Sequence, residues 1–180
     1  MSNYDFERKH ALLDTNILSQ MTRQSKKSES FRPVFEFLKE NNCQMFVTDA
    51  TRFEFAGFST NNKDFCRVLE WIEQFPSLLI TKEDIETATL LSAMYKCKNP
   101  NINPKQISFV DCLHASQLIK YKERAFIVTS DVNDYPSFLF DMPHHQPIEM
   151  DSGETSLVSF KTYNEEKYRI LEEDFRNSGN

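Results

Sequence analysis

Glycine is scarce in this sequence. Among 180 residues, only Gly57, Gly153 and Gly179 are glycines. A backbone loop that cradles phosphate needs several glycines at fixed short spacing, so a P-loop and a dinucleotide-binding fingerprint are both excluded. Any phosphate chemistry in this protein must therefore depend on side chains and metal ions.

Long apolar runs and paired cysteines are also lacking. No apolar run approaches the roughly 18–20 residues that a membrane span needs, and the first nine residues contain no apolar signal segment. The 4 cysteines are widely spaced and form no CxxC pair, which predicts reduced and mostly buried thiols. Together these features predict a cytoplasmic protein without a membrane partner.

Positive charge is in the minority, because the formal net charge is -6. This balance argues against a sequence-independent DNA coat and against a polybasic membrane binder. A nucleic acid substrate is still compatible with the charge, because a nuclease that works through metal ions needs carboxylates at its centre.

The apolar residues predict an α/β fold. Continuous short apolar runs, typical of strands covered on both faces, occupy residues 11–13, 45–47, 78–80 and 125–128. Longer segments with helical spacing lie between them, at residues 31–41, 64–75, 83–96 and 109–121. Alternating strands and helices predict a three-layer sandwich around a central, mostly parallel sheet.

We expect one main domain over residues 1–150 and a short appendage over residues 151–180, with a strand at 156–163 and a helix at 165–176. Pro136 and Pro143 predict a break in regular structure after Asp134. The 16 phenylalanines and Trp71 are interpreted as core residues and not as platforms for base stacking.

Acidic residues follow two of the predicted strands directly. Asp14 ends the first apolar run and Asp131 closes the fourth, and ligands of open α/β sheets bind beyond the carboxyl ends of the strands. Glu54 and Asp111 lie in similarly apolar segments, with Asp134 as a fifth candidate. Clustered carboxylates repel one another and are costly to bury, and a divalent cation such as Mg²⁺ or Mn²⁺ relieves both costs.

Each acid taken alone has an ordinary structural explanation. Asp14 could cap the next helix, and Asp111 could complement a helix dipole in a first turn. Glu54 could be a solvated helix residue, and Asp131 could form a turn. The joint placement of these residues at successive element ends favours the metal site.

Four segments resemble the motifs of PIN domains. Leu12 to Leu18 reads as a hydrophobic strand followed by Asp-Thr-Asn. The other three, in order, are residues 48–55 with Glu54, residues 107–115 with Asp111, and residues 126–135 with Asp131 and Asp134. Over residues 10 to about 140 the sequence is similar to PIN-domain ribonucleases, and among them to the VapC-type toxins.

The resemblance implies an endoribonuclease, either a toxin of a toxin–antitoxin pair or a defence effector. It implies that one or two Mg²⁺ or Mn²⁺ ions are held by four carboxylates, those of Asp14, Glu54, Asp111 and Asp131. Asp134 would hold a second ion through water. The metal would lower the pKa of a bound water that attacks an RNA phosphodiester. Three further residues would orient the carboxylates, namely Asn16, Thr129 and Ser130.

The resemblance also implies partners: an RNA substrate, an antitoxin or another protein, and a second copy of the chain in a homodimer. Contact with RNA phosphates is assigned to five basic residues, Arg23, Lys26, Lys27, Arg52 and Lys105. The alternative for these residues is an ordinary solvated face.

Two other functions compete with the nuclease. A catalytically idle PIN-like module would serve as a binding scaffold, but all four acidic positions are retained. A haloacid-dehalogenase-like phosphatase also begins with a strand ending in Asp, yet it needs a second Asp two positions later. Asn16 occupies that position here, which argues against the phosphatase.

Overall fold

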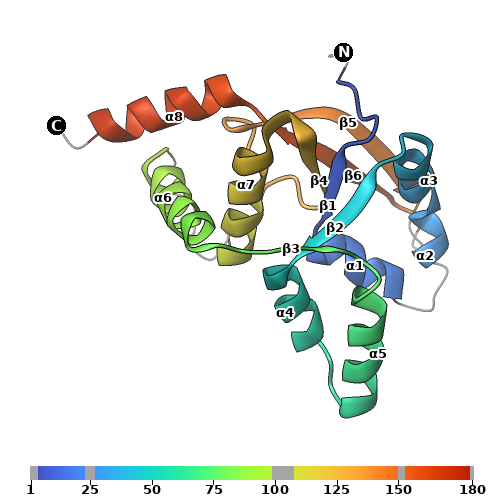
Figure 1. The fold of residues 1–180 in the computed structure, drawn as a ribbon. Coiled ribbons are helices and arrows are strands. Elements are labelled where there is room, and N and C mark those ends of the chain that lie inside the picture. Colours follow the sequence, from blue (N-terminus) through green and yellow to red (C-terminus); the bar gives the residue numbers. More distant parts are fainter. Residues whose placement is uncertain (1–3, 23–26, 99–107, 150–152, 179–180) are drawn as a thin grey trace.

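The computed structural model describes residues 4–22, 27–98, 108–149 and 153–178, with the side chains of residues 21–28 left out. One six-stranded sheet forms the centre of the molecule, in the order β3-β2-β1-β4-β6-β5 (Figure 1). The strands span His10–Leu13 (β1), Gln44–Thr48 (β2), Ser77–Leu78 (β3), Ala125–Thr129 (β4), Phe140–Glu149 (β5) and Thr155–Tyr163 (β6).

The sheet is mixed and mostly parallel. β1 pairs in parallel with β2 and β4, and β2 pairs in parallel with β3. β6 pairs antiparallel with both β4 and β5. In the shared register His10 of β1 lies between Gln44 and Ala125, so three strands deliver their carboxyl ends to the same edge.

Helices cover both faces of this sheet. They are α1 (Thr15–Thr22), α2 (Lys27–Ser30), α3 (Arg32–Glu40), α4 (Asp49–Gly57), α5 (Asn62–Ile72), α6 (Lys82–Lys98), α7 (Phe109–Tyr121) and α8 (Glu165–Asn177), with a 3-10 turn at Lys122–Arg124. α1 and α3 lie on one side of the sheet, and α6, α7 and α8 lie on the other (Figure 1). The α/β sandwich predicted from the sequence is therefore confirmed.

Strand residues alternate between two cores, as expected of strands covered on both faces. Leu13 and Val128 pack with α1 and α3, whereas Leu12 and Ile127 pack with α6, α7 and α8. All four of these side chains are fully or almost fully buried. This double burial explains why the strands appear in the sequence as continuous apolar runs.

Polar side chains begin several of the helices. Thr48, Asn61, Ser108 and Asn164 each accept a hydrogen bond from the backbone N–H three residues later. Such caps satisfy amide groups that a helix leaves unpaired in its first turn. Because Thr48 also ends β2, the strand passes directly into α4 without an intervening loop.

Two sequence predictions about strands need correction. The third apolar run gives a strand of only two residues, Ser77–Leu78, and Leu79 is exposed. Residues 140–149 form a strand despite Pro143 and Pro147. β5 is an edge strand, where proline removes no essential ladder bond, and its register shifts between Asp141 and His144, around Pro143.

The last segment of the chain is built into the sheet. β6 lies between β4 and β5, and Phe160 of β6 is fully buried in the same core as Phe126 of β4. α8 follows β6 and buries Leu171 in the core shared with α6 and α7. The strand and helix predicted after residue 151 are thus both present.

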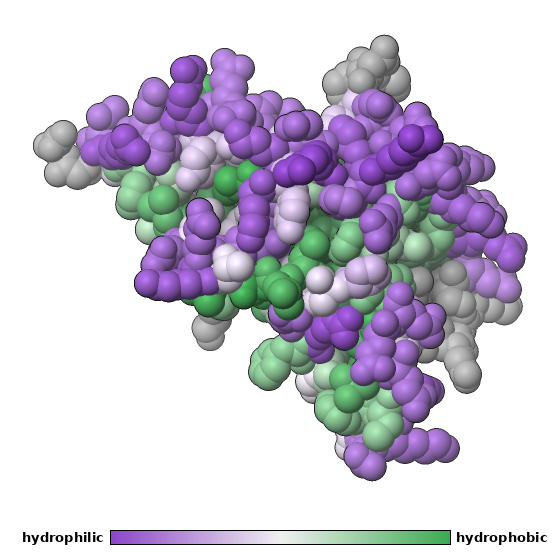
Figure 2. Space-filling model, viewed as in Figure 1, coloured by the Kyte–Doolittle hydropathy of each residue, from purple (hydrophilic) through white to green (hydrophobic). Residues whose placement is uncertain are grey.

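The interpretation of every phenylalanine as core is wrong. Phe53, Phe58 and Phe109 are more than half exposed, and apolar side chains reach the surface around α4 and α5 (Figure 2).

The prediction of mostly buried thiols is also wrong, because Cys66 and Cys97 are exposed, although all four cysteines are free. Among the described residues, no helix combines the length and the apolar character that crossing a bilayer requires.

Candidate metal centre

A cleft of about 510 Å³ opens where β1, β2 and β4 end, and we call it the carboxylate cleft. Its walls come from β1 and α1, from α4, from the start of α7 and from the loop after β4. It is lined by Asp14, Thr15, Asn16, Ser19, Glu54, Phe58, Ser108, Asp111, Ser130, Asp131 and Asp134. The fold therefore brings all five candidate acids into one cleft.

Asp14 is the most deeply placed acid, with 4% of its surface exposed. One of its oxygens, Oδ2, accepts hydrogen bonds from Asn16 Nδ2 at 2.7 Å and from Thr129 Oγ1 at 2.7 Å. The backbone N–H of Asp14 donates to Val128, which extends the β1–β4 pairing by one step. The carboxylate is thus fixed between the ends of two central strands.

The predicted orienting residues form one connected group behind Asp14. Asn16 Nδ2 lies 3.0 Å from Thr129 Oγ1, and Asn16 Oδ1 accepts from the backbone N–H of Ser130 at 3.1 Å. Thr129 Oγ1 in turn accepts from the N–H of Asp131 at 3.0 Å. These contacts connect the Asp14 turn to the loop that carries Asp131.

Glu54 and Asp111 are each held by a hydroxyl-bearing neighbour. Thr15 Oγ1 donates to Glu54 Oε2, which joins α1 to α4. Ser108 and Asp111 form a capping box at the start of α7, in which Asp111 Oδ2 accepts from the N–H of Ser108 at 2.8 Å. Asp111 thus lies in the first turn of α7, as considered from the sequence, and the capping box occupies one oxygen of a side chain that also lines the cleft.

Asp131 and Asp134 lie further out, on the loop after β4. Asp131 is exposed, and its Oδ1 accepts from the N–H of Asn133 at 3.0 Å, so it forms the turn considered from the sequence. Asp134 is half-buried and lines the same cleft.

Burial and the charges of neighbouring acids raise the pKa values of Asp14, Asp111 and Asp134. Burial raises the pKa of Asp14 to about 6, with a further contribution from Glu54. Burial raises the pKa of Asp134 to about 7, helped by the charges of Asp111 and Asp131. The pKa of Asp111 is raised by burial and by Asp14. No lysine or arginine lines the cleft among the residues that the structure describes, so a bound cation would be the natural counter-charge.

A buried histidine lies directly behind the acids. His114, one turn after Asp111 on α7, is fully buried, and burial lowers its pKa to about 4. Its Nε2 lies 2.8 Å from Thr51 Oγ1 and 3.3 Å from Thr48 Oγ1, and its Nδ1 lies 3.0 Å from the Tyr135 hydroxyl. The neutral ring thus joins α7 to the start of α4 and to the loop beside Asp134.

The donor set suits a hard divalent cation. Ligand atoms of Asp14, Asp111 and His114 lie within 4.8 Å of one another. Both nitrogens of His114 already contact hydroxyl groups, which leaves carboxylate oxygens as the available donors. Oxygen donors of this kind, in a polar cleft open to water, fit Mg²⁺ or Mn²⁺ better than a softer ion.

Of the five basic residues assigned to substrate, Arg52 is the one whose side chain the structure describes. Arg52 Nη2 donates to the backbone carbonyl of Phe75 at 2.8 Å, so its side chain fastens α4 to the end of the α5 segment. It does not line the carboxylate cleft, and its contact with RNA phosphate stays a prediction. Arg23, Lys26 and Lys105 lie outside the described residues, as does the side chain of Lys27.

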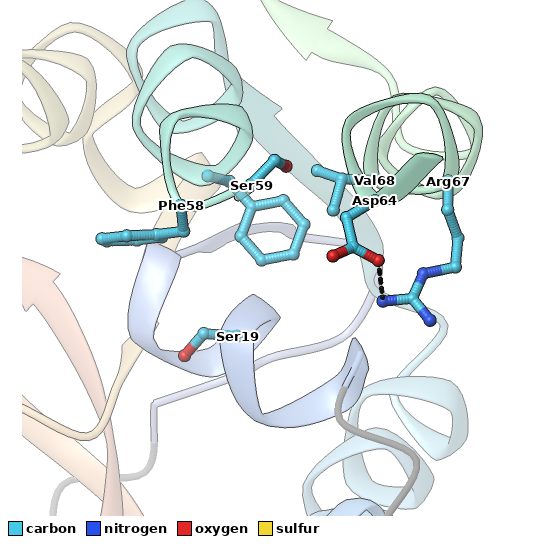
Figure 3. Close-up of a pocket in the computed structure, with 7 residues that line it drawn as sticks. Ser19, Phe58, Ser59, Asp64, Arg67 and Val68 are labelled. Carbon is cyan, nitrogen blue, oxygen red and sulfur yellow. Dashed lines mark ion pairs between the residues drawn. The ribbon is translucent and has the colours of Figure 1, made fainter. Parts of the chain in front are cut away.

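A second cavity of about 300 Å³ adjoins the carboxylate cleft, and we call it the side pocket. It lies between α1, the end of α4 and the start of α5 (Figure 3). Its lining residues are Ser19, Phe55, Phe58, Ser59, Asp64, Arg67 and Val68. Ser19 and Phe58 line both cavities, so the two spaces meet at these side chains.

Sequence reasoning missed the supporting residues around the acids. Thr15, Ser108 and the His114 contacts were not singled out for these roles. Spacing offers a local signal only for Ser108, three residues before Asp111, which is the pattern of a capping box. The partners of His114 come from separate elements, so no local pattern joins them.

Comparisons with known proteins agree with this architecture. The sequence profile described as "PIN domain" matches residues 11–133. One solved structure, "Toxin-antitoxin complex from Klebsiella pneumoniae", matches with a TM-score of 0.52 and 18% identity. The match covers 71% of this chain and 91% of that chain, and at this identity it supports the fold alone. No curated protein matched the sequence.

Proposed function

Because the chain belongs to the PIN-domain family, we propose that it is a divalent-metal-dependent endoribonuclease acting at the carboxylate cleft. PIN domains are generally nucleases. The observation that carries the proposal is the convergence of five acids with no basic residue among the described lining. Such a cluster is costly for a scaffold to maintain, whereas it is needed by an enzyme that holds cations.

In this proposal Asp14, Glu54, Asp111 and Asp131 hold one or two Mg²⁺ or Mn²⁺ ions, and Asp134 contributes at the rim. When bound, the cation supplies Lewis-acid chemistry, because it lowers the pKa of a water and offsets negative charge on the phosphodiester.

The chain's own residues provide orientation. Asn16 and Thr129 hold Asp14 Oδ2 in place, Thr15 holds Glu54, and the capping box holds Asp111. Carboxylates held in this way are preorganised, so binding a cation costs little further ordering of side chains.

An antitoxin partner is a second part of the proposal. The similar Klebsiella pneumoniae structure is titled as a toxin–antitoxin complex, and the chain shares its fold. We propose that this protein is likewise a toxin that a protein partner inhibits. The homodimer and the cytoplasmic location stay predictions.

Cleavage of RNA with and without Mn²⁺ tests the enzymatic proposal. Asp111→Asn should lose cleavage, whereas Asp49→Asn should retain it. Asp49 is a matched control because it also follows a parallel strand, is exposed, accepts a hydrogen bond from Ser77 and does not line the cleft. Equal cleavage by both variants would reject the site, and binding of Mn²⁺ without cleavage would favour the idle scaffold.

Growth of an expressing strain tests the toxin. Expression of the wild-type protein should arrest growth, and Asp131→Ala should relieve the arrest. Normal growth of the wild-type strain, with active purified enzyme, would reject the toxin role and leave the nuclease intact.

A further inference from the structure

The side pocket lies beside the carboxylate cleft and differs from it in chemistry. Phe58 directly follows α4 as its C-cap and is 65% exposed, although it contributes to the lining of both cavities. An exposed aromatic ring beside a cavity offers a face on which a flat ligand can stack. The ring belongs to the lining that the two cavities share.

Polar groups accompany the aromatic rings of this pocket. Phe55 is buried in the pocket lining, and Asp64 and Arg67 form an ion pair of 3.4 Å on α5 (Figure 3). Ser59 Oγ is buried and has no hydrogen-bond partner among the described residues. An aromatic surface with hydrogen-bonding groups at its edge matches a flat heterocycle that carries donors and acceptors.

The two cavities differ in the charge of the side chains that line them. The carboxylate cleft repels phosphate in the absence of a cation, and its described lining contains no lysine or arginine. In the side pocket, the charge of Asp64 is balanced by Arg67. Stacking of bases on aromatic rings is a contact that adds affinity for RNA without a basic surface.

We propose that the side pocket is a nucleobase subsite, which takes one unpaired base of the RNA strand whose phosphodiester lies in the carboxylate cleft. This inference rests on the proposed nuclease function and adds a contact that holds one base of the substrate. The base stacks on Phe58, where the side pocket meets the carboxylate cleft. A base that is paired in a duplex cannot leave its stack without cost, so the substrate is single-stranded RNA or a loop.

Three variants and two RNAs test the subsite. The variants are Phe58→Ala, Phe58→Trp, which keeps an aromatic ring, and Phe53→Ala. Phe53 is a matched control because it lies on the same helix, is 84% exposed and lines neither cavity. The RNAs are a labelled oligonucleotide that the wild type cleaves and the same strand hybridised to its complement. Binding is measured by fluorescence anisotropy with Ca²⁺ in place of Mn²⁺, so that the acids keep a counter-charge, and KM is measured with Mn²⁺.

The expected result is specific to one side chain. Phe58→Ala should weaken binding of the single strand by about 5- to 140-fold, the range of one lost stacking contact. Phe58→Trp and Phe53→Ala should bind within about 3-fold of wild type. The duplex should be cleaved poorly by every variant. An abasic nucleotide at the stacked position should weaken binding to the wild type and add no further loss in Phe58→Ala.

Other outcomes would overturn the inference. Equal binding by Phe58→Ala and wild type, or equally fast cleavage of the duplex, would reject the base subsite while leaving the nuclease intact. If Phe58→Ala kept full RNA affinity but escaped inhibition by a protein partner, the pocket would be a protein-docking site. Failure of the wild type to cleave either RNA with Mn²⁺ would reject the proposed function itself, and the subsite with it.

Discussion

Asp14→Asn is expected to stabilise the metal-free protein while abolishing its response to metal. The pKa of Asp14 is raised from 3.8 to about 6 by burial, and one pKa unit corresponds to 1.36 kcal/mol. The ionised side chain therefore costs the metal-free native state about 3 kcal/mol above pH 7. Asparagine keeps an oxygen that can accept from Asn16 and Thr129, and it carries no charge.

The effect is measurable as a melting temperature in EDTA at pH 8. A chain of 180 residues shifts by about 2–4 °C per kcal/mol, so the increase should be several degrees and at most about 12 °C. Adding Mn²⁺ should raise the melting temperature of the wild type and leave Asp14→Asn unchanged. A lower melting temperature of Asp14→Asn in EDTA, or an equal response to Mn²⁺, would refute the reasoning.

The free energy of unfolding of the wild type and of Asp14→Asn should also depend differently on pH. A raised carboxyl pKa means that the native state binds more protons than the unfolded state, so stability falls as pH rises from about 4 to about 7. His114 acts in the opposite direction, because its pKa is lowered to about 4 and stability falls as pH decreases from 6.5. His114 is present in both the wild type and Asp14→Asn, so its contribution cancels when their stabilities are compared. The stability difference between the two proteins should therefore grow with pH across this window. A constant difference would contradict the pKa of Asp14.

Three further changes test other parts of the structure. His114→Leu should weaken Mn²⁺ binding about tenfold or more, measured by calorimetry, because the contacts between α4, α7 and the Asp134 loop are lost. The control Ser116→Ala, buried on the same helix but bonded only to its own helix backbone, should bind Mn²⁺ normally. Asp84→Ala should cost about 2–4 kcal/mol in urea unfolding without changing Mn²⁺ affinity, since it removes the partner of Lys120 and the cap of α6. Leu171→Ala should cost about 2–5 kcal/mol in one cooperative transition, and an unchanged transition would show that α8 is not part of the folded unit.

Much of the sheet could be predicted because its central strands are buried on both faces. Ala11 to Leu13 and Phe126 to Val128 lie between two cores, and burial of this kind requires an unbroken apolar run. β5 was not predicted because it lies at the edge of the sheet and is not buried on both faces. As an edge strand it tolerates Pro143 and Pro147 and alternates in exposure, so its pattern resembles a loop.

The acids of the site could be predicted and their supporting residues could not. Asp14 and Asp131 follow apolar strands directly, and the position of a strand end is a local property of the sequence. The contacts of His114 with Thr51 and Tyr135 join residues 63 and 21 positions apart, so they exist only after folding. The exposure of Phe58 likewise depends on which helices pack against α4, and composition alone assigned it to the core.

The position of β6 in the sheet affects when this protein can fold during synthesis. β4, which supplies Thr129 to the support of Asp14, pairs along one side with β6, a strand that begins 26 residues after β4 ends. Until residues 155–163 leave the ribosome, the nascent chain exposes an apolar strand edge that can pair with other chains. Translation therefore has to continue well past the last acid of the cleft before the sheet that holds that cleft is closed. A pause in translation just before β6 would leave every acidic residue synthesised while the sheet is still incomplete, in the form most exposed to aggregation and proteolysis.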